Sequence, residues 1–198
     1  MAKHPVAWID VIPQDQAHGD LNTAYETVKS EDGTVENLYL AMSQTPQAIQ
    51  PADALYLALL HNPDNPLKPW LSELICTYVA ILCGCNYAAE NHGANFEIYL
   101  GDTERAASIL AALRNDHWDK LEDGQANAAL RYTQKLSLTP HQMTSNDIIA
   151  LRHAKFCDKS ISYIIQLGAS FAYWARMING LGTQLGDHIG IQGILRAD

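Results

Sequence analysis

The stretch "WLSELICTYVAILCGCNYAAENHGANFEIYL", residues 70–100, decides the fold of this chain. As one helix it would exceed 30 residues, which is long for a globular protein, and Gly84 is the natural place for it to break. The part before Gly84 is apolar on nearly every side, which predicts a central buried helix. The part after it is expected to start close to Cys85, run to Tyr99 and stop at Gly101. We therefore predict two helices that fold back on each other at Gly84.

Apolar residues follow a helical period along most of the remaining chain. Only "VAWIDVI" (6–12) alternates like a strand, and we interpret it as an extended arm. No low-complexity segment or linker divides the chain. The sequence therefore predicts an all-α fold, in which residues 1–198 form a single helical domain with an irregular N-terminal arm. Further helices are expected at 20–29, 35–44, 46–60 (starting or kinked at Pro51), 104–114, 124–136 and 158–179, and another is opened by a capping box of Thr144 and Asp147.

The composition of the chain argues against two classes of function. There are 22 acidic and 13 basic residues, and the basic ones are scattered, which predicts no nucleic-acid binding and no docking on anionic membranes. The most apolar run, 74–83, is far shorter than the roughly 20 residues of a membrane-spanning helix. No secretory signal is seen, so we expect a cytoplasmic protein. Cys76 and Cys157 are expected to be small buried residues in a reducing environment.

Cys85, Ala88 and His92 follow one another at i, i+3 and i+7, within about 60° on one helix face. A thiol in the first turn meets free backbone N–H groups and the positive end of the helix dipole, so we expect its pKa to be lowered. An imidazole on the same face can relay a proton. Glu73 stands in an apolar run and therefore needs a partner or a raised pKa. On a straight helix it would lie about 18 Å from Cys85, so the two can meet only if the chain turns back at Gly84.

These residues resemble the alkyl hydroperoxidase D-like (AhpD-like) branch of the carboxymuconolactone decarboxylase family, whose pattern is Glu-x11-Cys-x-x-Cys-x3-His. The resemblance extends to flanking blocks that are similar to the peroxidase-related subgroup, so it covers nearly the whole chain. It implies an AhpD-like helix bundle, a carboxymuconolactone decarboxylase-like core at about 46–130, and a homo-oligomer between dimer and hexamer. The blocks are "WIDVIPQDQAHGDLNTAYETV", "GTVENLYLAMSQTP", "HNPDNPLKPWLSELI" and "DIIALRHAKFCDKSISYIIQLGASFAYWARMINGLG".

In family members with the complete motif, the second cysteine attacks the peroxide and the first closes a disulfide with it, while glutamate and histidine handle protons. Glu73, Cys85 and His92 match this pattern, and Ala88 replaces the attacking cysteine. The two-thiol cycle of the family cannot run through a methyl group. Cys83 is the other nearby thiol. It is either an auxiliary partner for Cys85, in a strained Cys-Gly-Cys ring, or the buried end of a helix.

Three hypotheses follow. The first is an enzyme that reduces a small organic hydroperoxide through Cys85, with Glu73 and His92 as proton-transfer groups and a thiol reductant or dithiol adaptor as its partner. The second is a cysteine-independent decarboxylase or proton-transfer enzyme that acts on a small organic acid through Glu73 and His92. The third is a non-catalytic oligomer, in which the site would be closed to solvent and Glu73 would simply pair with His92.

No cofactor is predicted. Cys83, Cys85 and His92 could be assembled into a zinc site, but the ligand spacing of closed zinc sites is missing, so no metal is predicted either.

Overall fold

The computed structural model describes residues 6–117 and 121–186, and every regular element in these ranges is helical. The all-α prediction is confirmed. The elements are η1 (Gln14–Gln16), α1 (Gly19–Val28), α2 (Asn37–Ala41), α3 (Pro46–Leu60), α4 (Pro69–Leu82), α5 (Asn86–Leu100), α6 (Thr103–Arg114), α7 (Gly124–Leu138), η3 (Pro140–Gln142), α8 (Ser145–His153) and α9 (Asp158–Leu181).

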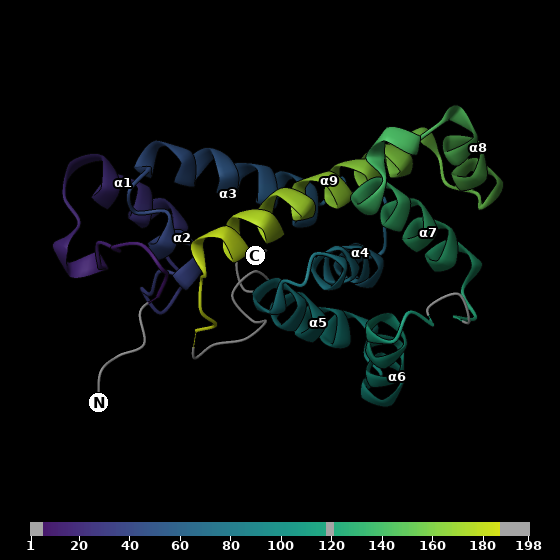
Figure 1. Cartoon of the computed structure of the whole chain (residues 1–198), viewed down its shortest axis with the longest axis horizontal. Helices are drawn as coiled ribbons and strands as arrows, with labels where there is room; N and C mark the ends of the chain where they lie inside the picture. Colours follow the sequence, from purple (N-terminus) through teal and green to yellow (C-terminus); the bar gives the residue numbers. More distant parts are fainter. Residues whose placement is uncertain (1–5, 118–120, 187–198) are drawn as a thin grey trace.

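Helix α4 forms the centre of the packing. Every residue from 71 to 80 is buried, as expected for a helix that is apolar on nearly all sides. Pro69 is its first residue, where the missing N–H of proline costs no helical hydrogen bond. Helices α5, α7 and α9 pack around it (Figure 1). The predicted central buried helix is therefore confirmed.

The chain reverses between α4 and α5 as predicted. Gly84 has φ +62°, a left-handed conformation that would cost a residue with a side chain roughly 1–2 kcal/mol. The N–H of Gly84 donates to the carbonyl of Ile81, and the N–H of Cys85 donates to that of Ala80 at 2.8 Å. These bonds close the end of α4. The turn therefore folds α5 back along α4, so that residues well before Gly84 lie beside residues well after it.

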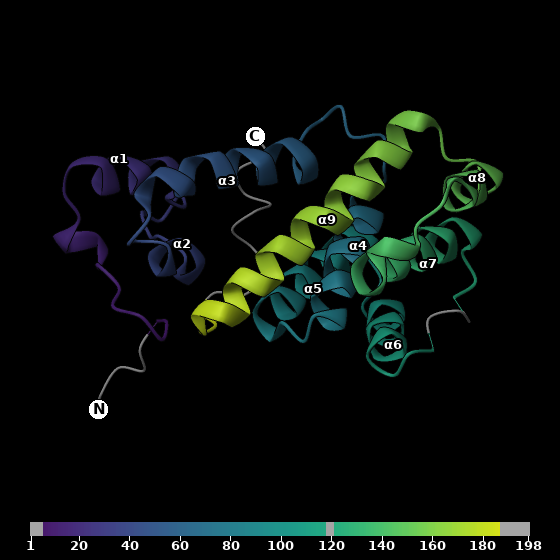
Figure 2. The same cartoon turned by 45° about the horizontal axis from the view of Figure 1, so that its top comes forward.

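The longest helix, α9, crosses over α4 and α5, while α1 and α2 lie at one end of the molecule and α3 runs from that end towards the middle (Figure 2). Helix α3 begins at Pro46 and runs through Pro51 without starting there. Helix α2 has only five residues and is shorter than the predicted 35–44. The capping box of Thr144 and Asp147 is present at α8, as predicted. Within the described ranges, no helix combines the length and apolar character needed to cross a membrane.

Residues 6–12 are not helical and lie as an irregular arm against the end of α9. The N–H of Trp8 donates to the carbonyl of Leu181 at 2.8 Å, and the N–H of Gln184 donates to that of Val6 at 2.9 Å. The N–H of Ile12 donates to the Ser43 hydroxyl at 3.0 Å. The arm therefore ties the region before α1 to the segment that follows α9.

Candidate functional site

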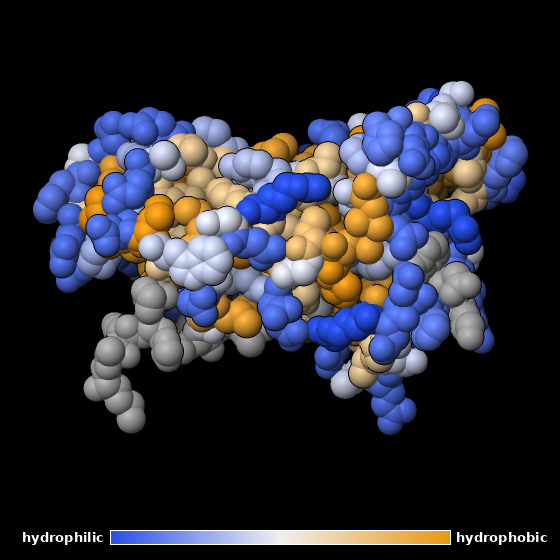
Figure 3. All heavy atoms as spheres, in the orientation of Figure 1, coloured by the Kyte–Doolittle hydropathy of each residue, from blue (hydrophilic) through white to orange (hydrophobic). Residues whose placement is uncertain are grey.

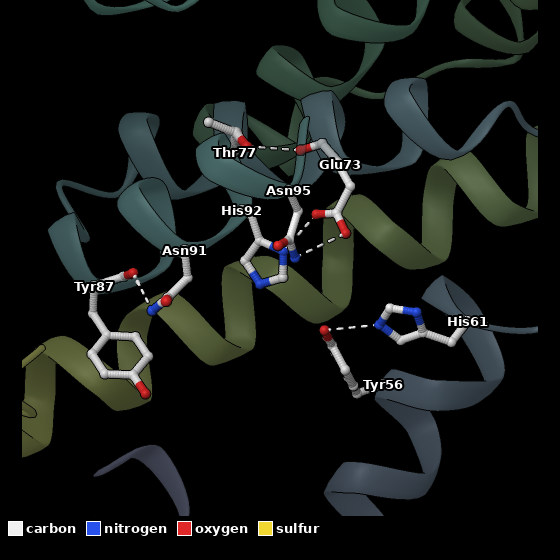
Figure 4. Close-up of polar contacts among 8 residues, drawn as sticks. All are labelled: Tyr56, His61, Glu73, Thr77, Tyr87, Asn91, His92 and Asn95. Atoms are coloured by element: carbon white, nitrogen blue, oxygen red, sulfur yellow. Dashed lines mark hydrogen bonds and ion pairs between the residues drawn. The ribbon is translucent and has the colours of Figure 1, made fainter. Parts of the chain in front are cut away.

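Glu73 of α4 and His92 of α5 form a buried pair. Glu73 is 1% exposed, and its Oε2 lies 2.7 Å from Nδ1 of His92 (Figure 4). The sequence predicted that an acid in this apolar helix needs a partner, and His92 is that partner. The turn at Gly84 makes the contact, because the two residues would lie far apart on one straight helix.

The hydrogen bond to Glu73 also determines which nitrogen of the His92 imidazole carries the proton. A carboxylate only accepts hydrogen bonds, so Nδ1 of His92 carries the proton that it donates to Glu73. In the neutral ring, Nε2 then has a free lone pair and can act as a base. The second carboxylate oxygen, Oε1, accepts from Nδ2 of Asn95 at 3.2 Å. Asn95 is buried and was not predicted as a site residue. Its position at i+3 from His92, on the same helix face, is the signal that could have indicated it.

Two aromatic rings hold the His92 ring from other helices. Phe171 of α9 meets it edge-to-face, with ring centroids 4.6 Å apart and an interplanar angle of 86°. Tyr56 of α3 lies at 6.2 Å, and its hydroxyl is 3.0 Å from Nε2 of His61 (Figure 4). The His92 side chain is 12% exposed. The imidazole is therefore oriented on one side by a carboxylate and packed on the others by aromatic residues.

Cys85 is the N-cap of α5, as predicted, but its surroundings differ from the prediction. It is 1% exposed, and this burial raises the pKa of the thiol, while the N–H groups of Ala88 and Tyr87 lower it less. The predicted lowering by the helix N-terminus was therefore wrong in direction, because desolvation of the thiolate outweighs the favourable backbone. His92 lies two turns further along the same face, about 10 Å along the axis. The structure thus joins Glu73 to His92, and within the described ranges no hydrogen bond joins Cys85 to either of them.

The remaining cysteines, and Ala88 in place of the family's attacking cysteine, differ in their burial. Cys83, the C-cap of α4, is half-buried; burial raises its pKa, and the nearby Arg176 partly offsets this rise. Ala88 is buried. Cys76 is buried, as predicted, but the prediction for Cys157 was wrong. Cys157 is exposed at the start of α9, where hydrogen bonds, first that of the Ser160 hydroxyl, lower its pKa.

No group of three or more His, Cys, Asp or Glu side chains in the described ranges could hold a metal ion. Two clefts of the described part, about 610 and 310 Å³ in volume, lie elsewhere. The larger is lined by α7 and α8, and the smaller lies between α4, the end of α5, α6 and the start of α7. Neither is lined by Glu73, Cys85 or His92.

No family model matches the sequence, and no curated protein matches it significantly. Solved structures do match the fold. The alkylhydroperoxidase AhpD core of an uncharacterized peroxidase-related protein from Ralstonia eutropha JMP134 superposes with a TM-score of 0.80 at 23% identity, over 96% of this chain and 97% of that one. An uncharacterized peroxidase-related protein from Silicibacter sp. TM1040 gives 0.79 at 19% identity, over 98% of both chains.

A third structure, a protein of unknown function from Agrobacterium tumefaciens whose description names the antioxidant defence protein AhpD, gives a TM-score of 0.56 at 16% identity. The match covers 74% of this chain and 96% of that one. At these identities the likeness shows the fold alone. The chain therefore has the AhpD-like fold expected from its sequence.

Proposed function

We propose that this protein is a peroxidase-related oxidoreductase that reduces small organic hydroperoxides through Cys85, with Glu73 and His92 as its proton-transfer groups. The observation that carries the proposal is the buried Glu73–His92 pair, in which His92 follows Cys85 by seven residues and is held in one tautomer by its 2.7 Å hydrogen bond. The fold shared with two proteins described as peroxidase-related supports the same class of reaction.

The reaction balances with one cysteine and an external thiol. The Cys85 thiol loses its proton to His92, and the thiolate attacks the terminal oxygen of the hydroperoxide. The O–O bond breaks, Cys85 becomes a sulfenic acid, and the departing alkoxide takes up a proton and leaves as an alcohol. A thiol of the reductant, either a small thiol or a dithiol adaptor, then displaces water from the sulfenic acid, and a second thiol releases Cys85 as a thiol.

The separation of positions 85 and 88 from His92 determines the expected rate of peroxide reduction. A thiol at residue 88 would lie one helical turn from His92, whereas Cys85 lies two turns away. Proton exchange between Cys85 and His92 therefore needs water or the substrate between them. We expect slow turnover in the chain with Ala88 and fast turnover once a thiol is placed at position 88.

The test is the consumption of tert-butyl hydroperoxide with dithiothreitol as the reductant. We expect weak activity in the wild type, loss in Cys85→Ser, and a gain of at least tenfold in Ala88→Cys. The gain should disappear in Ala88→Cys/His92→Gln, because the restored thiol depends on the imidazole. A wild type indistinguishable from Cys85→Ser would contradict the proposal for this chain. If the Ala88→Cys protein were also inactive, the scaffold itself would lack the chemistry.

A second candidate is a cysteine-independent proton-transfer enzyme acting on a small organic acid. The observation that favours it is the thiol itself: Cys85 is buried and has a raised pKa, while His92 keeps a free nitrogen beside Tyr56. This function predicts turnover of a β-keto acid that survives thiol alkylation and is lost in His92→Gln. Absence of both activities would leave the non-catalytic hypothesis, which also expects Glu73 and His92 to be paired.

A further inference from the structure

The free nitrogen of His92 points to a second participant in the site. Nδ1 is bonded to Glu73, and in the described part of the chain Nε2 has no hydrogen-bond partner. The ring that packs beside it from α3 carries a hydroxyl group, that of Tyr56. Figure 4 shows this hydroxyl directed from α3 towards the Glu73–His92 pair. A group that can accept a proton and a group that can donate one are therefore neighbours on different helices.

Tyr56 is held in place by His61. The hydroxyl lies 3.0 Å from Nε2 of His61, and the two rings meet edge-to-face at 5.1 Å and 62°. When the Nε2–H of His61 donates to the phenol oxygen, the phenol proton stays available for another acceptor. Such a donated bond also stabilises a developing phenolate. His61 is the first residue after α3, so Tyr56 and the histidine that orients it both lie at the C-terminal end of that helix.

The surroundings keep the phenol protonated. Burial raises the pKa of Tyr56 well above its usual value, and nearby acidic groups raise it further. Tyr56 is therefore a proton donor at neutral pH, which complements a neutral imidazole with a free Nε2. The groups that face Tyr56 electrostatically are Glu73, Glu36, Tyr39 and Cys76, in addition to its ring contacts with His61 and His92.

We infer that Tyr56, oriented by His61, is a further proton donor of this site, and that it protonates the leaving oxygen of a small substrate while His92 takes the proton of the attacking thiol. The alkyl-bearing oxygen of a hydroperoxide is such a leaving group. As sulfur bonds to the terminal oxygen and the O–O bond breaks, the Tyr56 proton passes to the departing alkoxide. The proton that His92 took from the thiol returns to the phenolate through solvent, so the step is balanced. The inference rests on the proposed function in treating Glu73 and His92 as the proton-transfer couple.

The first experiment removes the hydroxyl and keeps the ring. Tyr56→Phe should lower kcat for tert-butyl hydroperoxide about a hundredfold, in the wild type and in the faster Ala88→Cys protein, with KM changed much less. Tyr173→Phe is the matched control, because this α9 phenol is 51% exposed and lies outside the site; it should keep full activity. An unchanged kcat in a folded Tyr56→Phe protein would overturn the inference.

A second variant separates a proton donor from a structural support. Replacing Tyr56 with 3,5-difluorotyrosine keeps the shape and the hydroxyl but makes the phenol more acidic. The alkaline limb of the kcat–pH profile should then move to lower pH, since the donor form is lost earlier. A difluoro protein with a normal rate and an unmoved alkaline limb would show that the hydroxyl serves packing only and would contradict the inference.

A binding measurement keeps the inference testable if peroxide turnover itself fails. Saturation-transfer NMR can follow binding of tert-butyl hydroperoxide to Cys85→Ser, which cannot reduce it. Adding Tyr56→Phe should weaken this binding roughly three- to tenfold, the effect of one hydrogen bond, whereas adding Tyr173→Phe should not. Equal binding in the two double variants would overturn the inference, whatever the wild type does with peroxide.

Discussion

At the scale of single residues, Glu73 shows why an acid persists in an apolar helix. An ionised carboxylate out of water is costly unless it is paired and hydrogen-bonded. Here both of its oxygens have donors, Nδ1 of His92 at 2.7 Å and Nδ2 of Asn95 at 3.2 Å. Removing a hydrogen-bond partner from a buried charged group typically costs about 1–3 kcal/mol or more, because the charge is left with an unmet hydrogen bond. The pair therefore shapes the core as well as the site.

The thiols give a residue-scale prediction about pH. Alkylation proceeds through the thiolate, so its rate rises with pH until the pKa is passed. Cys157 has a lowered pKa and Cys85 a raised one, so we expect the Cys157 rate to level off at a lower pH than the Cys85 rate. Peptide-resolved mass spectrometry after short iodoacetamide pulses measures both in one sample. The pH at which each rate levels off is compared, and not the rates themselves, because burial slows the alkylation of Cys85 at every pH. A Cys85 plateau below that of Cys157 would show that the helix N-terminus dominates after all.

At the scale of elements, the α4–α5 hairpin creates the site. Its turn depends on Gly84 at φ +62°, and the two helices then bring Glu73 opposite His92. Gly93 of α5 differs, since it has helical geometry inside the hairpin. A Cβ there would make ordinary contacts, 3.6 Å from Cδ1 of Leu110 and 3.8 Å from Cγ2 of Thr77. The same residue type therefore has two different roles within ten positions.

We predict opposite effects of alanine at these two glycines. Gly84→Ala should lower the free energy of unfolding by about 1–2 kcal/mol, because the left-handed conformation is strained for alanine. Gly93→Ala should leave it unchanged or raise it by up to about 1 kcal/mol, because alanine favours the helix. Urea denaturation of both variants beside the wild type measures the difference. Equal destabilisation would show that packing around Gly93, rather than backbone conformation, controls this hairpin.

At the scale of the whole molecule, the arm before α1 meets the end of α9. Trp8 is bonded through its backbone to Leu181, and its indole covers Gly182, which has φ +62°. Figure 3 shows apolar side chains gathered near the centre of one face, over the region of α4, α7 and α9, with hydrophilic ones around them. Large apolar side chains are also exposed on several helices, among them Leu55, Ile98 and Leu138. The homo-oligomer and the cytoplasmic location remain predictions.

The contact between the N-terminal arm and α9 predicts that alanine costs more stability at Gly182 than at Gly101. Gly101→Ala places a Cβ in open space at φ +69° and should cost only the backbone strain, about 1–2 kcal/mol. Gly182→Ala adds an overlap with the Trp8 ring, so it should cost more and should release the arm. Thermal unfolding and Trp fluorescence follow the two effects. In a Trp8→Ala background the two substitutions should become equal, and a persisting gap would place the extra cost elsewhere than at the indole.

The sequence by itself determined the features that depend on local chemistry. The break at Gly84, the central apolar helix α4, the capping box of α8 and the need of Glu73 for a partner all follow from periodicity, helix-ending residues and the cost of a buried charge. These effects act within a few residues along the chain, so the order of helices was predictable to within a few positions. The length of α2 differed because tertiary packing overrides weak local preferences.

The tertiary structure alone decided which groups meet and how much water reaches them. Asn95 could be suspected from helix spacing, but the rings of Tyr56 and Phe171 come to His92 from α3 and α9, and His61 contacts Tyr56. The direction of the Cys85 pKa shift depends on burial, which outweighs the favourable helix N-terminus, and Cys157 is exposed at the start of α9. Burial is a sum over contacts between residues far apart in sequence, whereas helix formation is decided among neighbours. That difference separates what could be predicted here from what had to be seen.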